Sequence, residues 1–519
     1  MSPRGRLGRL VTGADARAAG LGLVSGFAAG AVMILVTVLL RIRAGIPLPT
    51  ELVSDRILPF VPVGRFLDML NALGGPIRAK QIGYFSAFAA QMATGLALGA
   101  AHGVLRHRGR RATAIVGAVL AVLLVVLCAL LWPELDASYR GLALGQARLA
   151  TIGGLALSFA VFLLVLDAAG RVLARGRPPE AGAPAGGTMP RRAFLVAGAG
   201  AVAGLGTLGA IRSLYRDGAF GYDGLSLRPS QLSEVTPTGN FYTVTKNLID
   251  PDVDEGAWGL EVTGHVEEPR TYTLADLRAM RRVEQTQTLQ CISNSVGGGL
   301  IGNAEWAGVR LADLLAAGRP REGAVQVFFH GVDGFTNTMS MERAMRPIAL
   351  IALEMNGAPL DRRHGFPARL LAPGSYGEVS VKWVTRIEVR TDEAEGYYGR
   401  QGWEADHVQT MSRFFDLRAG SRVTPGRVGL RGVAFAGDRG ISGVEVSTDG
   451  GRTWRAARLV YNPSPIAWTI WTLPWDARPG THELVVRAAD GTGAPQTAEV
   501  RGIDPAGASG WHRIEVTVA

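Results

Sequence analysis

Cys291 is the residue whose type and surroundings point most directly to chemistry. It lies in LQCISNSVGGGLIGNAEW, residues 289–306, whereas the other cysteine, Cys128, lies in an apolar run. Glycine lets a backbone approach a bound group closely, and a thiolate is a ligand for soft metals. A buried structural thiol is the competing interpretation, and residue types alone do not separate the two. For Cys128, packing as a small hydrophobic residue is favoured.

The segment around Cys291 belongs to a polar second half of the chain that begins near Asp223. Short β-type runs are frequent there and helical patterns are few. The predicted strands are Gly259–Gly264, Val325–His330 and Val381–Arg390, and the predicted helices are Leu274–Met280 and Val309–Ala317. This mixture predicts an α+β domain with long loops.

The first half of the chain is predicted to be a membrane domain. It contains five apolar stretches, and each approaches the roughly 20 residues that a spanning helix needs. They are Leu21–Leu40, Ile82–Leu105, Ala112–Leu131, Leu149–Leu166 and Ala193–Leu214. Flanking arginines favour a cytoplasmic N-terminus, although Arg41 and Arg43 lie on the opposite side. Five spans would place the following residues outside the cytoplasm, in a multi-pass protein of the inner membrane.

Composition narrows the possible classes further. The 519 residues carry a formal net charge of +10, and 47% are hydrophobic. Two cysteines exclude a disulfide scaffold, an iron–sulfur protein and a Cys₄ zinc module. Much of the positive charge is arginine beside apolar runs, which is typical of membrane topology, so no nucleic-acid partner is expected.

A Pro/Gly/Ala-rich segment, residues 176–190, predicts a flexible linker before the last apolar stretch. It is followed by Arg191-Arg192-Ala193-Phe194-Leu195, which resembles a twin-arginine export signal. Two ordinary arginines on the cytoplasmic side are an equal alternative. Twin-arginine export carries folded domains, so it would suit a domain that acquires a cofactor in the cytoplasm.

Three separated motifs closely resemble the molybdopterin domain of the sulfite oxidase family. They are Leu289–Leu315, His364–Val384 and Asn240-Phe241-Tyr242, the last followed by matching residues in Trp258–Gly264 and Leu274–Leu277. From about Val423 the chain resembles that family's C-terminal immunoglobulin-like domain. There Val444–Trp454 reads as a hairpin closed by Asp449-Gly450-Gly451, and Gly510-Trp511-His512 matches near the end. The membrane-anchored bacterial members are the most similar.

The resemblance implies a chain of three parts. Residues 1–214 would form an α-helical transmembrane bundle, residues 225–410 an α+β molybdopterin-binding oxidoreductase domain, and residues 411–519 an immunoglobulin-like β-sandwich of the dimerisation type. A homodimer is therefore possible. Trp454, Trp468, Trp471 and Trp475 would belong to the core and interface of the sandwich.

The family also implies roles for individual residues. Its members hold molybdenum through one cysteine thiolate and the dithiolene of a single pterin, so Cys291 would be the metal ligand and a catalytic residue. Cofactor-binding positions would be Asn240, Tyr242, Cys291, Asn294, His364, Arg369, Ser380, Val381 and Lys382. Arginine, lysine and backbone amides suit an anionic phosphate. A tyrosine near the metal assists catalysis, and Tyr397 or Tyr398 would take that role, with Tyr397 preferred.

Two departures from the family leave the substrate open. Animal and plant sulfite oxidases bind an oxyanion with several arginines. Val296 stands where one of them has its place, and Thr245-Lys246-Asn247 stands where another lies in an Arg-Asn-His stretch. Lysine does not replace arginine at a bidentate site. The substrate is therefore a small oxyanion such as sulfite or an S- or N-oxide, and a methionine-sulfoxide-type reductase is the alternative.

The electrons of such a reaction need a partner. No cytochrome b5 segment fits this chain, and His102 is the single histidine inside an apolar stretch, so no haem is predicted. We expect a separate carrier, either an extracytoplasmic cytochrome or a quinone-linked partner. A catalytically silent membrane assembly or binding subunit and a transporter with an extracytoplasmic appendage are the competing classes. Cys291 disfavours the first, and the lack of clear polar clusters in residues 1–214 disfavours the second.

Overall fold

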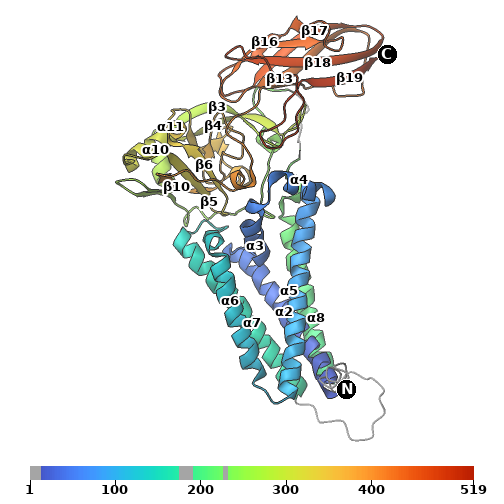
Figure 1. Ribbon diagram of the computed structural model, residues 1–519, viewed down its shortest axis with the longest axis vertical. Coiled ribbons are helices and arrows are strands. Elements are labelled where there is room, and N and C mark those ends of the chain that lie inside the picture. The colour runs from blue at the N-terminus through green and yellow to red at the C-terminus, as the bar shows by residue number, and fades with distance from the viewer. Residues whose placement is uncertain (1–12, 175–190, 226–231) are drawn as a thin grey trace, which may run out of the picture. The chain divides into compact units, whose positions relative to one another are not determined.

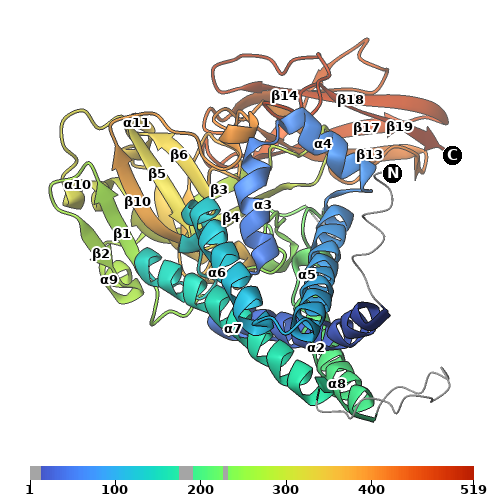
Figure 2. The same cartoon turned by 60° about the horizontal axis from the view of Figure 1, so that its bottom comes forward.

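The chain folds into an α-helical unit and a β-rich unit (Figures 1 and 2). The structure, a computed structural model, describes residues 13–174, 191–225 and 232–519; the predicted linker at 176–190 lies outside them. The helical unit takes in the chain up to Arg56 together with Gly74–Tyr139 and Leu144–Phe220. The β-rich unit comprises Gly221–Ala519 and two short segments, Ile57–Leu73 and Arg140–Ala143. The two units therefore alternate along the sequence.

Five long helices dominate the helical unit, as the sequence predicts. They are α2 (Gly13–Ala44), α5 (Pro76–His107), α6 (Ala112–Leu130), α7 (Leu144–Ala174) and α8 (Arg191–Arg216). Each is long and apolar enough to cross a membrane. Most extend past the predicted apolar stretch, because a helix does not end where its apolar residues end. The shorter elements before Leu260 are α3 (Pro49–Ile57), η1 (Leu58–Phe60), α4 (Val63–Ala72), η2 (Trp132–Asp136), η3 (Ala219–Gly221) and η4 (Thr238–Asn240).

Helices α2 and α5 pack with their backbones in contact. Gly22 and Gly26 of α2 face Gly99 of α5, and a Cβ added at any of the three would clash with backbone atoms of the opposite helix. Glycines four residues apart lie on one face of a helix and allow this close approach, which is a common arrangement between spanning helices.

A buried ion pair explains the basic residue at the predicted outer end of the first span. Arg41 Nε lies 2.9 Å from Glu51 Oε2, and both side chains are almost completely buried. The guanidinium carbon lies 3.4 Å from the centroid of the Tyr139 ring. Charges in apolar surroundings are tolerated when they are paired, so the ion pair accounts for a buried arginine at this end of α2.

Two sheets form the first part of the β-rich unit. One has the order β2 (Arg270–Tyr272), β1 (Leu260–Gly264), β10 (Val384–Arg390), β5 (Gln326–Gly331) and β6 (Thr336–Ser340), with β1 and β10 parallel. The other has the order β3 (Val283–Gln290), β4 (Ile301–Arg310), β7 (Leu350–Met355) and β8 (Ala358–Pro359), and β9 (Arg369–Leu371) also pairs with β7. Short helices α9 (Leu274–Ala279), α10 (Leu311–Gly318) and α11 (Met341–Ala344) and the 3₁₀ turns η5 (Arg362–His364) and η6 (Gly399–Gln401) complete it.

The predicted strands and helices of this part are confirmed, but two boundaries are wrong. Strand β10 begins at Val384 because Trp383 has a φ of 51°, a conformation that cannot continue a strand. Helix α10 begins at Leu311 because Val309 and Arg310 pair with β7 as the end of β4.

The last hundred residues form a two-sheet β-sandwich. One sheet has the order β11 (Met411–Phe414), β13 (Gly426–Phe435), β17 (Thr469–Ala477) and β16 (Arg458–Tyr461). The other has the order β12 (Ser421–Val423), β19 (His512–Val518), β18 (Gly480–Asp490), β14 (Ile441–Ser447) and β15 (Arg455–Ala456). The predicted hairpin is confirmed, since Val446 of β14 is paired with Arg455 of β15. Trp471 and Trp475 lie in the core, whereas Trp454 is only half-buried, against Trp511.

The sandwich shares a hydrophobic cluster with the α+β part of the same unit. Ile292, Ile301 and Tyr376 of the α+β part pack with Val433 and Trp468 of the sandwich. Backbone bonds add to this contact, because the amide of Thr288 donates to the carbonyl of Ile466 at 2.9 Å. The two parts are therefore held together by a continuous core.

Candidate functional site

Cys291 lies directly after β3, in a short loop that leads to β4. Its thiol is buried, and Sγ lies 2.9 Å from Ser293 Oγ. The Cys291 amide donates to the carbonyl of Leu300 at 3.0 Å, and Asn294 Oδ1 accepts from the Leu300 amide at 2.8 Å. These bonds close the loop, so Asn294, predicted to contact the cofactor, has a clear structural part in positioning the thiol.

The surroundings of Cys291 fit a metal ligand better than a free nucleophile. Burial raises the pKa of the thiol to about 12, and the nearby Glu378 adds to the effect. A thiol that stays protonated is a poor nucleophile, but a bound cation would supply the charge that stabilises the thiolate. The described residues hold no group of three or more His, Cys, Asp or Glu side chains that could bind a metal ion. A metal at Cys291 would therefore need further ligands from a bound organic group.

Aromatic residues form one wall near the thiol. Phe241 stacks on Tyr242 with ring centroids 5.5 Å apart and meets the ring of His364 edge-on at 5.6 Å. Gly377 lies so close to the Tyr242 hydroxyl that a Cβ there would clash with it. The predicted residue Asn240 ends the turn before Phe241 and is half-buried. The sequence motif thus places Tyr242 in the interior, where its pKa lies well above the ordinary value because of burial.

Three predicted basic residues lie in the same region, and none forms a salt bridge with a residue that the structure describes. His364 Nε2 lies 3.2 Å from the carbonyl of Thr238, Arg369 Nη1 donates to the carbonyl of His364 at 3.4 Å, and Lys382 Nζ donates to the carbonyl of Arg363 at 3.2 Å. Burial lowers the pKa of Arg369 to about 10 and that of His364 to about 4, and it also lowers the pKa of Lys382. Arg369 and Lys382 are cations that a bound anion such as a phosphate would stabilise, whereas His364 is neutral near pH 7.

Ser380 and Val381 are used by the local fold. Ser380 Oγ accepts from the amide of Ala372 at 3.1 Å, and the carbonyl of Val381 accepts from the amide of Leu370 at 2.9 Å. The two residues hold the Lys382 segment against β9. Their predicted contact with a cofactor stays a prediction.

The structure places the two tyrosines beside Lys246. Tyr397 is buried, and Lys246 Nζ lies 5.7 Å from the centroid of its ring. Tyr398 is half-buried, with its ring centroid 5.2 Å from that of Tyr397. Lys246 Nζ also donates to the carbonyl of Asp333 at 2.9 Å. The preference for Tyr397 and its catalytic role both stay predictions.

Two further polar residues lie near Cys291 and are not predicted by the sequence motifs. Gln290 Oε1 and Glu378 Oε1 are buried and accept no hydrogen bond from any residue that the structure describes; Arg369 Nε likewise has no acceptor there. The amide of Gly377 donates to the carbonyl of Gln290 at 2.7 Å, which places Glu378 beside the end of β3. Burial raises the pKa of Glu378 to about 8. Buried polar atoms without partners are costly. The oxygens of Gln290 and Glu378 are acceptors that suit the N–H groups of a pterin, whereas Arg369 Nε–H is a donor that suits its phosphate.

Comparisons with known proteins cover the β-rich unit. Residues 247–398 match the oxidoreductase molybdopterin binding domain, and residues 416–519 match the Mo-co oxidoreductase dimerisation domain. Sulfite oxidase of Gallus gallus is 33% identical over 332 residues, which are 54% of this chain and 72% of that protein. Mitochondrial sulfite oxidase of Homo sapiens is 34% identical over 346 residues, 56% of this chain and 63% of that protein. Sulfite oxidase of Arabidopsis thaliana is 30% identical over 347 residues, 54% of this chain and 88% of that protein. The chain thus spans less than two thirds of the human relative.

Proposed function

The chain belongs to the sulfite oxidase family of molybdopterin-dependent oxidoreductases, and on that premise we propose that it performs a two-electron oxygen-atom transfer at molybdenum bound by Cys291. The observation that carries the proposal is the buried thiol near buried polar atoms that have no hydrogen-bond partner among the described residues. When bound, the molybdenum cofactor supplies the site where an oxygen atom and two electrons are exchanged. The protein contributes the thiolate, the binding of the pterin and the selection of substrate.

The residues that would hold a single molybdopterin have distinct tasks. Arg369, Lys382 and His364 would surround its phosphate, because they lie in one region and form no salt bridge with a described residue. Tyr242 and Asn240 would bound the pterin, and Asn294 would fix the loop that carries the metal ligand. The side chain of Ser380 and the backbone of Val381 would keep Lys382 in place.

The substrate is proposed to be a small oxyanion, with sulfite as the representative. In that reaction sulfite and water give sulfate, two protons and two electrons. Lys246 beside Tyr397 supports an anionic substrate, with Tyr397 as the assisting residue. Reduction of an S- or N-oxide such as methionine sulfoxide, which consumes two electrons and two protons and releases water, is the second candidate. The uncharged Val296 in the loop after Cys291 favours it.

A membrane topology is part of the proposal. If the five apolar helices each cross once, residues 57–73 follow the first span, residues 140–143 the third and residues 221–519 the fifth, so all three lie on one side. These are the segments that make up the β-rich unit. We place that unit outside the cytoplasm, in a membrane-anchored enzyme that passes electrons to a separate cytochrome or quinone-linked carrier. Its C-terminal part would mediate a homodimer.

Export through the twin-arginine route fits this topology. Arg191 and Arg192 form the exposed first turn of α8. A domain that binds a molybdenum cofactor before export would need a route for folded proteins. Replacing both arginines by lysine would then leave residues 221–519 on the cytoplasmic side, as protease protection in spheroplasts would report.

Metal and pterin analysis tests the proposal. We expect about one molybdenum and one pterin per chain in the purified protein, and the same in Cys128→Ala, which serves as the matched control. Cys291→Ala should lose the metal or the activity, because no other described side chain offers a thiolate at the site. Wild-type protein that is free of metal after expression in a cofactor-competent host would contradict the proposal and favour a catalytically silent subunit.

A further inference from the structure

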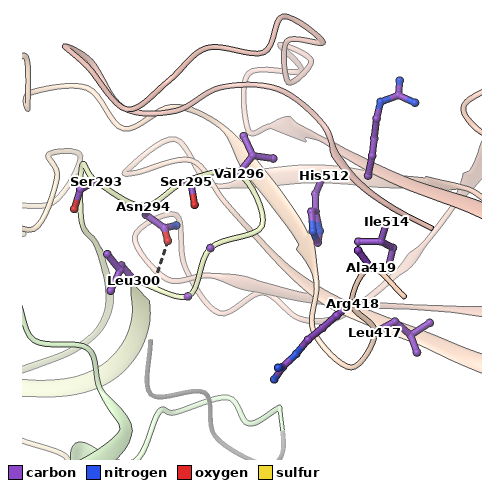
Figure 3. Close-up of a pocket in the computed structure, with 13 residues that line it drawn as sticks. Ser293, Asn294, Ser295, Val296, Leu300, Leu417, Arg418, Ala419, His512 and Ile514 are labelled. Atoms are coloured by element: carbon purple, nitrogen blue, oxygen red, sulfur yellow. Dashed lines mark hydrogen bonds between the residues drawn. The ribbon is translucent and has the colours of Figure 1, made fainter. Parts of the chain in front are cut away.

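A cavity of about 800 Å³ lies between the loop after Cys291 and the C-terminal sandwich. The loop lines it with Ser293, Ser295 and Val296, and the sandwich lines it with Arg418 and His512 (Figure 3). Its volume is in the range of ligand-binding cavities, which is roughly 300–1,000 Å³. Two parts of the β-rich unit that are distant in sequence therefore bound one space.

This cavity reaches the metal-ligand side of the loop. Ser293 is part of its lining, and Ser293 Oγ lies 2.9 Å from Cys291 Sγ. A small molecule in the cavity is thus separated from the thiol by a single hydroxyl-bearing residue. A substrate in this cavity would therefore lie close to the metal-ligand residue Cys291.

The charge of the lining comes from the sandwich alone. The loop contributes serines, Asn294, Val296, Leu300 and glycines, which are all uncharged, and no acidic side chain is among the described residues of the lining. Arg513, a neighbour of His512, is engaged by Glu483, with Nη1 and Oε1 3.0 Å apart. Arg418 is exposed and forms no salt bridge with a described residue. Its guanidinium is the charge left for a ligand.

Arg418 lies just before β12, which pairs with β19, the strand that begins at His512 and contacts the loop. The His512 ring packs so closely on Gly297 that a Cβ there would clash with it. His512 Nδ1 accepts from the amide of Phe414 at 3.1 Å, which holds the ring in place. The amide of Arg418 donates to Ser421 Oγ at 2.9 Å, which fixes the turn before β12.

From this arrangement we infer that Arg418 binds the oxyanion of the substrate. It would provide the positive charge that the loop lacks, because Val296 is uncharged. The inference rests on the proposed function and makes it more specific, because it names a small oxyanion as the ligand class. It assigns selection of the substrate to the sandwich, a part of the chain that does not carry the metal ligand. The guanidinium suits a tetrahedral or pyramidal oxyanion because it donates two parallel hydrogen bonds.

The test compares Arg418→Met and Arg418→Lys with Arg422→Met in the holoenzyme. Arg422 lies in β12, is also exposed and does not line the cavity, so it is the matched control. Sulfite oxidation is followed with ferricyanide as a one-electron acceptor, and binding of inorganic sulfate is measured by calorimetry. Arg418→Met should raise the KM for sulfite and the Kd for sulfate about 10- to 100-fold, with kcat and molybdenum content unchanged. Arg418→Lys should lie between, and Arg422→Met should equal the wild type.

The outcomes separate this inference from the proposed function. Wild-type KM and Kd in Arg418→Met would overturn the inference and leave oxygen-atom transfer intact. A wild-type enzyme that reduces methionine sulfoxide and does not bind sulfate would also overturn it. Sulfate binding that depends on Arg418 in an enzyme without sulfite turnover would support the anion site and refute sulfite as substrate. If Arg418→Met loses its metal, Arg418→Lys decides by its sulfate Kd.

Discussion

The region around Cys291 and the cavity beside its loop differ in where their positive charge comes from. Around the thiol, Arg369 and Lys382 come from the α+β part, where Arg369 is buried and Lys382 is half-buried. In the cavity the loop is uncharged, and Arg418 comes from the sandwich and is exposed. A cofactor that stays bound can be held by buried groups, whereas a substrate that exchanges needs charges that remain hydrated. On the proposed function, the cations around the thiol would retain the cofactor and Arg418 would select the substrate.

The largest effect on cofactor content is expected from removing a buried cation. Arg369→Met should lower pterin and molybdenum content about tenfold or more, because a charge-assisted hydrogen bond contributes roughly 1.5–3 kcal/mol. Pterin fluorescence and elemental analysis measure the loss. Arg363→Met is the control, since Arg363 is exposed and lies over the ring of Tyr222 at 4.2 Å. Full pterin content in Arg369→Met would mean that the buried guanidinium does not hold the phosphate.

Adding a positive charge to the loop after Cys291 should increase the preference for a charged substrate over an uncharged one. Val296→Arg would place a second guanidinium in the cavity and lower the KM for sulfite by about tenfold, whereas the KM for an uncharged sulfoxide should not fall. Val296→Met, which changes size without charge, is the control. Steady-state kinetics with both substrates give the ratio. An equal change for the charged and the uncharged substrate would show that shape and not charge is selected in the cavity.

The smallest expected effect concerns Glu378 and pH. Its folded pKa of about 8 lies above the ordinary carboxyl value of 4.5, so the unfolded chain gives up this proton at a lower pH than the folded chain does. The contribution of the protonated carboxyl to stability is fully present below pH 4.5 and is lost as the pH rises towards 8. Glu378→Gln should therefore stabilise the cofactor-free protein at pH 8, by about 1–2 kcal/mol because the residue is only partly buried, and change little at pH 4.5.

Thermal unfolding at the two pH values checks this prediction. Glu404→Gln, at an exposed carboxylate of the same unit, should have no such pH dependence. A Glu378→Gln protein that gains nothing at pH 8 would indicate that the carboxyl is solvated in the folded chain.

Local patterns explain which parts of the fold the sequence predicts. Apolar stretches predict the five long helices, and alternation predicts β1 and β5, because both signals depend on neighbouring residues. Boundaries depend on distant contacts. The start of α10 is decided by the pairing of Val309 and Arg310 with β7, and the backbone conformation of Trp383 decides the start of β10. The pairing of Arg41 with Glu51 is likewise a tertiary contact that charge counting does not anticipate.

The same distinction applies to the site. Cys291, His364 and Arg369 are predicted by motifs, and the structure brings His364 and Arg369 into direct contact. Glu378 was missed because a glutamate in a polar loop is expected to be solvated. Its burial follows from the bond between Gly377 and Gln290, which no local pattern reveals. Arg418 was missed for the corresponding reason, since its importance comes from the loop it faces and not from its neighbours in sequence.

The segments Ile57–Leu73 and Arg140–Ala143 have a practical consequence for anyone who wishes to isolate the catalytic unit. Gln401 Nε2 donates to the carbonyl of Leu58 at 2.7 Å, and Arg140 Nη1 lies 2.9 Å from Asp252 Oδ2. A protease cut after α8 would release a fragment that lacks these two segments, although they belong to the same unit. The loops between the long helices are therefore part of the β-rich unit, and removing the helices would remove part of that unit as well.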